Sequence, residues 1–426
     1  MCSVDAASVR PFWWRAGLLL GAGTAGLYLV LALLAFSFLK QRGYEISFAD
    51  VTLPTHWKRF PEIQARLFFN QGREAYAAGR LNEAVLALSF AYERAPQNYE
   101  AGALLAWVWQ ASQPTLSNRI YFQLLREHPE RRAETAQRWY RILLNRGDFE
   151  SIGRLAIEQL ATPTANADAP WTYALLFASR QAPAAQLLAK ALERKDLLSP
   201  EVRGILQWEE RLHAADPESA ATARLEASRD IPTTPFALHH RIDSLIRLGR
   251  PREAQQLLTT HGASLDERTR ATLTLAALGA DNDTHRRRSE IRGLLQSGPT
   301  AAVVEFVTAN LIRYPDDGLV REYLSTLEQH PLPPAAEHFS AYAGLFCLAA
   351  LSHDAEHSRH LAETLRHLSG SPLSFLESVE RFFHGETEDR RLSTYLSRLQ
   401  PLPLEVVFAL YDRTDADGRQ AKASRP

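Results

Sequence analysis

The feature that most constrains this chain is the spacing of its apolar residues. From Glu62 onward, leucine, alanine and other apolar residues recur at intervals of three and four positions, and segments of alternating apolar and polar residues are nearly absent. Intervals of three and four match the turn of an α-helix, whereas alternation matches a strand. We therefore expect the chain beyond its N-terminal region to form an all-α fold.

The clearest helical unit is the stretch 65–98, in which small residues stand at set places among large apolar ones. Gly72 and Ala84 stand where two antiparallel helices need small side chains to approach each other closely. Gly79 stands between the helices and favours the left-handed conformation that ends a helix. Pro96 follows the second helix and cannot continue it. The stretch therefore predicts two paired helices joined by a tight turn.

This unit resembles the tetratricopeptide repeat (TPR), a helix-turn-helix unit of about 34 residues. Several positions that define the family agree at once: Phe68, Gly72, Gly79, Leu81, Ala84, Leu88, Ala91 and Pro96. The resemblance implies an irregular TPR-like α-solenoid of helix-turn-helix repeats. An unrelated helical bundle whose turns contain glycine is the alternative.

Weaker copies of the unit follow along the chain. The helix–glycine–helix pattern returns around Gly147, Gly249 and Gly298. Two further helix pairs without the glycine are expected at 171–199 and 341–368. Where the family prefers a small residue, two of the copies carry isoleucine instead, Ile242 and Ile291. The repeats are therefore expected to be irregular.

Ahead of the repeats, the run from Ala16 to Leu39 contains no charged residue and follows Trp13 and Trp14. As an α-helix this run covers about 36 Å, enough to cross a hydrocarbon core of about 30 Å. A retained single-pass anchor is favoured over a cleaved signal peptide, because the run is longer than a signal peptide's apolar region and no clear cleavage site follows. Basic residues flank the run in similar numbers. We expect a bacterial inner-membrane protein with its body in the periplasm.

These features predict a division of the chain into seven parts. They are an N-terminal tail (1–15), a transmembrane helix (16–39), a stalk (40–61), N-terminal TPR-like repeats (62–161), degenerate repeats (162–330), C-terminal helical repeats (331–412) and a disordered polar tail (413–426).

Two motifs could carry additional functions. Gly17, Gly21 and Ala25 lie four residues apart in the apolar run, a spacing that lets membrane helices approach closely, so this stripe is a candidate for self-association. His353, His357 and His360 are spaced to share one face of a helix, and two imidazoles four residues apart can bind a metal. No carboxylate or cysteine set with a known spacing completes that site. A helical enzyme or metal-binding subunit is therefore the alternative interpretation only.

Composition and missing motifs narrow the function further. The net charge of −1 provides no field that would direct the chain to nucleic acid. Two cysteines, Cys2 and Cys347, exclude a disulfide framework and a cysteine-rich zinc site. The motifs of serine hydrolases, zinc proteases and P-loop enzymes do not occur in the sequence. The sequence predicts a non-catalytic protein with no cofactor.

In the TPR family the first helix of each repeat lines a groove that binds a partner. Carried over residue by residue, the resemblance places these residues on that groove: Arg66, Phe69, Arg73 and Tyr76 in the best unit, and Phe236, His239, Asp243 and Ile246 in the unit around Gly249. Arginine mixed with aromatic residues suits a peptide with apolar anchors and some negative charge. The lysine and asparagine with which some members clamp a C-terminal carboxylate are missing. The predicted function is a membrane-anchored scaffold for an unidentified protein partner, and packing of these residues against the chain itself is the alternative.

Overall fold

The computed structural model describes residues 13–162, 168–181, 185–213, 234–296, 298–399 and 401–423. Within these ranges the chain forms helices and no strand, which confirms the all-α prediction. Contacts divide the chain into two compact units, unit 1 (Met1–Trp139) and unit 2 (Tyr140–Pro426).

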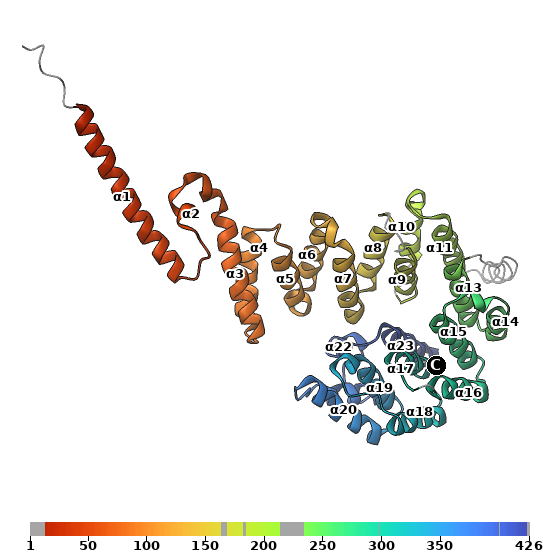
Figure 1. The fold of residues 1–426 in the computed structure, drawn as a ribbon. Helices are drawn as coiled ribbons and strands as arrows, with labels where there is room; N and C mark the ends of the chain where they lie inside the picture. The colour runs from red at the N-terminus through yellow and green to blue at the C-terminus, as the bar shows by residue number, and fades with distance from the viewer. Residues whose placement is uncertain are drawn as a thin grey trace, which may run out of the picture. The chain divides into compact units, whose positions relative to one another are not determined.

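Unit 1 begins with one long helix and continues in helix pairs (Figure 1). Its elements are α1 (Trp13–Gln41), α2 (Phe48–Thr52), η2 (Pro54–Arg59), α3 (Phe60–Ala77), α4 (Leu81–Arg94), α5 (Tyr99–Ser112), α6 (Pro114–Glu127) and η3 (Pro129–Arg131). Helix α7 (Arg132–Arg146) begins in unit 1 and continues into unit 2.

Unit 2 continues the succession of helix pairs (Figure 1). Its elements are α8 (Phe149–Leu160), α9 (Asp168–Gln181), α10 (Ala185–Glu193), η4 (Lys195–Leu197), α11 (Pro200–His213), α13 (Pro235–Arg247), α14 (Pro251–His261), η5 (Gly262–Ser264), α15 (Glu267–Ala280), α16 (Thr284–Gln296), α17 (Ala301–Arg313), α18 (Asp317–Gln329), η6 (Ala336–His338), α19 (Phe339–Leu351), α20 (Ala355–Ser369), α21 (Leu376–Phe383), α22 (Leu392–Leu396) and α23 (Leu404–Ala423).

The pair α3–α4 confirms the helix-turn-helix prediction for the best unit. Gly79 has φ +74° in the turn between the two helices. A Cβ atom on Gly72 would lie 2.7 Å from Cγ of Leu88, so only glycine allows this approach of α3 to α4. Ala84, Leu88 and Ala91 are fully buried along α4. Small residues at these positions thus set how closely the two helices pack.

Helix α1 is the one helix among the described residues that is long and apolar enough to cross a membrane. The segment after it, expected as a stalk, contains α2 and η2. The carbonyl of Thr52, at the end of α2, accepts a hydrogen bond of 2.6 Å from the Tyr28 hydroxyl of α1. This segment therefore folds back along α1.

Two turns in unit 2 differ from the sequence-based expectation. Gly298 lies between α16 and α17, whereas the tight turn that pairs α15 with α16 is made by Asn282 at φ +56°. His353, also at φ +56°, makes the turn between α19 and α20. Asparagine and histidine are among the residues that tolerate the left-handed region, so these turns need no glycine. The glycine pattern alone therefore pairs α16 with α17 in place of α15 with α16. The expectation that His353 shares a helix face with His357 and His360 is wrong, because His353 lies in the turn before that helix.

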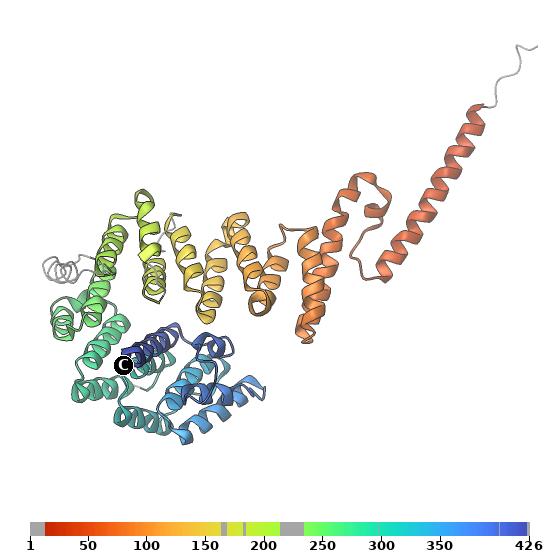
Figure 2. The same cartoon turned by 180° about the vertical axis from the view of Figure 1, so that it is seen from behind.

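The last helix, α23, returns to the middle of unit 2 and packs along α17 (Figures 1 and 2). The polar stretch from Arg413 to Ala423, predicted as a disordered tail, continues this helix. Residues 424–426 of that predicted tail lie outside the described residues. Packing of the first turns of α23 extends a helix into a stretch that carries no apolar pattern of its own.

Candidate functional site

In unit 1 the predicted groove residues of α3 share one side of that helix. Arg66 and Arg73 are exposed, and Phe69 and Tyr76 are half-buried. The guanidinium carbon of Arg73 lies 5.9 Å from the ring centre of Phe69. The indole nitrogen of Trp107 on α5 donates a hydrogen bond of 2.8 Å to the Tyr76 hydroxyl. These five residues form what we call the α3–α5 face.

The positive charges of the α3–α5 face lie at the solvent. Arg66 faces Glu45 at 3.8 Å, and both side chains are more than 60% exposed, so water screens this pair and it contributes little. Within the described residues, the guanidinium group of Arg73 makes a cation–π contact with the ring of Phe69. A carboxylate that arrives from outside can therefore bind these two guanidinium groups at small desolvation cost.

The predicted groove residues of unit 2 lie in a different environment. On α13, the rings of Phe236 and His239 lie 5.2 and 4.8 Å from the ring of Tyr173 on α9. Asp243 accepts hydrogen bonds from Arg180 and Arg247, at 3.2 and 2.9 Å. Ile246, named with them, is buried. All of these residues have partners within unit 2.

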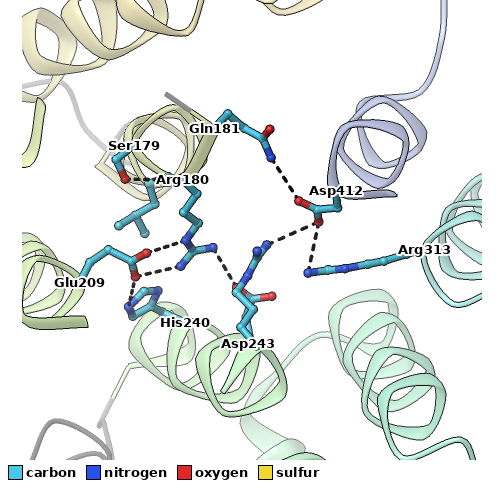
Figure 3. Close-up of polar contacts among 10 residues, drawn as sticks. Ser179, Arg180, Gln181, Glu209, His240, Asp243, Arg313 and Asp412 are labelled. Atoms are coloured by element: carbon cyan, nitrogen blue, oxygen red, sulfur yellow. Dashed lines mark hydrogen bonds and ion pairs between the residues drawn. The ribbon is translucent and has the colours of Figure 1, made fainter. Parts of the chain in front are cut away.

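A network of ion pairs surrounds Asp243 (Figure 3). Arg180 on α9 donates two hydrogen bonds to Glu209 on α11, at 2.5 and 2.9 Å, and a third to Asp243. Its side chain is only 13% exposed. Buried ions need close partners of opposite charge, and here one guanidinium links two carboxylates from two further helices.

The C-terminal helix joins this network through Asp412 (Figure 3). Its carboxylate pairs with Arg313 on α17 at 3.2 Å and with Arg247 on α13 at 3.7 Å. The Gln181 side chain on α9 donates to it at 3.4 Å. Asp412 therefore receives positive or polar groups from three helices that are each the first of a pair.

Burial and neighbouring charge act on the ionisable groups of the network. Burial alone would raise the pKa of Asp243, but Arg247, Arg180 and Arg313 together hold its pKa well below the usual value. Burial is also the largest cause for His240, and it lowers the pKa of that imidazole to about 4. The network is thus built around an ionised Asp243 and a neutral His240.

Aromatic contacts hold the apolar side of α23. The ring of Phe408 lies 4.5 Å from that of Phe177 on α9, and the ring of Tyr411 lies 5.1 Å from that of Phe149 on α8. The Tyr411 hydroxyl donates to the Leu144 carbonyl at 2.8 Å. Together with the contacts of Asp412, these contacts seat α23 against the first helices α7, α9, α13 and α17 and the start of α8. The sequence gives no signal for this placement, because the contacts of Phe408 and Tyr411 join residues more than 200 positions apart.

The three histidines that the sequence offered as a possible metal site, His353, His357 and His360, do not lie together. The ring of His353, in the turn before α20, lies 4.6 Å from that of His384. His357 lies between Asp354 and Glu328, with nitrogen–oxygen distances of 2.8 and 3.5 Å. His360 lines a largely apolar cavity of about 520 Å³ together with His357. In the described ranges, no group of three or more His, Cys, Asp or Glu side chains is arranged to hold a metal ion.

The small-residue stripe of α1 is open to its surroundings. A Cβ atom on Gly17 or Gly21 would meet nothing within 4 Å, and Ala25 is exposed. Self-association through this stripe stays a prediction.

Comparisons with known proteins add little. No family model matches the chain, and no curated protein matches it. Among solved structures, the crystal structure of the P58(IPK) TPR domain is similar over 85% of this chain and 99% of its own length, at 12% identity and a TM-score of 0.22. At that TM-score the likeness supports no argument about function, and the fold rests on the helix pairs described above.

Proposed function

We propose that the protein is a non-catalytic, membrane-anchored scaffold that recruits a protein partner through the α3–α5 face of unit 1. The partner segment is a peptide or helix that carries apolar anchors and acidic residues. Aromatic rings and arginine on one face suit such a ligand, because rings supply apolar contact area and guanidinium groups bind carboxylates in a fork. Helix α1 would keep the scaffold in its membrane.

One contrast carries this proposal. In unit 2 the first helices α9 and α17 contact a helix of the same chain, α23, whose Phe408 and Asp412 meet a ring of α9 and an arginine of α17. In unit 1 the arginines of the α3–α5 face are exposed. The internal helix is an example of the ligand chemistry that such a face accepts.

The test is photo-cross-linking in cells, followed by purification from solubilised membranes and mass spectrometry. Arg73→Glu reverses a charge at the centre of the α3–α5 face. Tyr76→Ala removes the side chain whose hydroxyl accepts the hydrogen bond from Trp107. Arg126→Glu makes the same charge change at an exposed position of α6, the second helix of its pair, and serves as the matched control.

We expect a cross-linked protein that is lost in Arg73→Glu and Tyr76→Ala and kept in Arg126→Glu, with unchanged helical circular dichroism in all three. If the two face variants keep every partner that the unaltered chain has, the α3–α5 face is not the recruiting surface. The compartment of the lost partner also tests the proposed location, with α1 in a bacterial inner membrane and the repeats in the periplasm.

A further inference from the structure

The segment after α1 covers one side of that helix. The residues of α1 that are shielded from solvent are Ala32, Phe36 and Leu39, which lie four and three positions apart and so share one face. The ring of Phe48 on α2 meets that of Phe36 edge-on at 5.8 Å. With the bond from Tyr28 to Thr52, these contacts extend along the last turns of α1.

The covered part of α1 matches its excess length. From Trp13 to Leu39 the apolar helix measures about 40 Å, whereas a hydrocarbon core is about 30 Å thick. The stretch from Ala32 to Leu39, which holds the shielded residues, measures about 10 Å, and the Tyr28 hydroxyl reaches the segment from one turn further toward the bilayer centre. If Trp13 and Trp14 lie at one interface, where such rings are enriched, this last stretch lies in the headgroup layer on the other side.

The outer side of the covering segment has the composition of a membrane interface. Three large apolar side chains of the segment are exposed by 39, 46 and 53%, although the first of them also contacts Phe36 of α1: Phe48, Leu53 and Trp57. The segment and its flanks carry four basic residues and two acidic ones: Lys40, Arg42, Lys58, Arg59, Glu45 and Asp50. Tryptophan and leucine beside lysine and arginine are typical of chain that lies in the plane of an interface.

The segment also pairs several of its polar groups internally. Asp50 accepts hydrogen bonds from the backbone and the hydroxyl of Ser47, at 2.8 and 2.6 Å, and lies 3.1 Å from a ring nitrogen of His56. The indole nitrogen of Trp57 donates to the Val51 carbonyl at 3.1 Å. Polar groups paired in this way cost less to move out of bulk water.

We propose that residues 44–59, which we call the collar, lie in the headgroup layer of the bilayer that α1 crosses. The exposed rings and leucine reach toward the acyl chains, and the flanking basic residues meet anionic phospholipid. The collar would fix the depth of α1 and the distance between the membrane and the first helix pair. This inference rests on the proposed anchoring by α1.

The test uses the full chain in vesicles of phosphatidylethanolamine and phosphatidylglycerol. Cys2→Ser removes one native thiol, and Cys347 is buried. Spin labels are attached to Leu53→Cys and to Lys58→Cys. The label at 58 gives a second reading of the depth of the collar and leaves the hydrogen bond from Trp57 to Val51 intact. Val30→Cys on α1 reports the membrane interior, and Leu86→Cys, exposed on α4, is the aqueous control. Power saturation with oxygen and with a nickel chelate gives the depth of each label.

We expect the labels at 53 and 58 to be several-fold less accessible to the nickel chelate than the label at 86, and shallower than the label at 30. If the labels at 53 and 58 match that at 86 while the label at 30 is lipid-buried, the collar is wrong and the anchor stands. If the label at 30 is also accessible to the nickel chelate, both the anchor and the collar are wrong.

Discussion

Arg73 on α3 and Arg180 on α9 both belong to the first helix of a pair, yet their surroundings are opposite. Arg73 is exposed and lies over the ring of Phe69. Arg180 is almost enclosed and links Glu209 to Asp243. Unit 2 supplies both the carboxylates that pair with Arg180 and the helix α23 that covers them. Among the described residues, no helix covers Arg73 on α3 in this way.

This comparison indicates how one type of repeat can serve two purposes. A charged face that is closed by internal partners holds the unit together, because a buried ion must be paired. A charged face that stays at the solvent contributes little to stability, and its charges remain accessible. Three predictions test the comparison, ordered from the largest expected effect to the smallest.

The largest effect is expected from Arg180→Met, which leaves Glu209 and Asp243 buried without their common partner. Breaking a buried ion pair from one side costs about 3–5 kcal/mol. Hydrogen exchange read by mass spectrometry should show that much lost protection in α9, α11 and α13. The matched change in unit 1, Arg66→Met, removes an exposed partner of Glu45 and should cost less than about 1 kcal/mol in α3. Equal losses in the two variants would contradict the comparison.

The second prediction concerns acid. The pKa of His240 falls from 6.5 to about 4 in the folded chain, so between these pH values the unfolded state binds more protons than the folded state. Stability is therefore fully present above pH 6.5 and is lost as the pH falls toward 4, by at most about 3 kcal/mol.

His240→Gln should remove this share and flatten the pH dependence of exchange protection in α13 between pH 6.5 and 4. His285→Gln alters an exposed histidine of α16 and serves as the control, which should leave the dependence unchanged. An unchanged slope in His240→Gln would show that other groups cause the loss in acid.

The smallest effects are expected from two glycines with opposite environments. Gly72→Ala places a methyl group 2.7 Å from Cγ and 3.2 Å from the backbone nitrogen of Leu88, and should cost about 1–3 kcal/mol in α3 and α4. Gly204→Ala in α11 meets nothing within 4 Å and should stabilise that helix by about 1 kcal/mol. The same sign for both variants in exchange protection would mean that close approach does not set the α3–α4 distance.

The sequence by itself determined the all-α class of the fold and how the best pair packs. The spacing of apolar residues requires helices because it matches their turn, and Gly72, Gly79 and Ala84 predict a close pair because only small residues allow that distance. The uncharged run of α1 is likewise visible in the sequence, because a helix of that length is long enough to cross a membrane. These signals are local, so they can be read in one dimension. The turn at His353 was missed because more than one residue type adopts the left-handed conformation.

Only the tertiary structure decided which charged face is closed. Asp243 and Arg73 look alike in the sequence, since each is a charged residue on the first helix of a predicted pair. Arg247 lies one turn from Asp243 on the same helix, but Arg180 and the helix that carries Asp412 reach Asp243 or its neighbours from distant parts of the chain and enclose it. A hydrophobic period specifies the side of a helix that is buried and not the segment that buries it. The pairing of Asp412 with Arg247 and Arg313 follows from the return of α23, which no local pattern records.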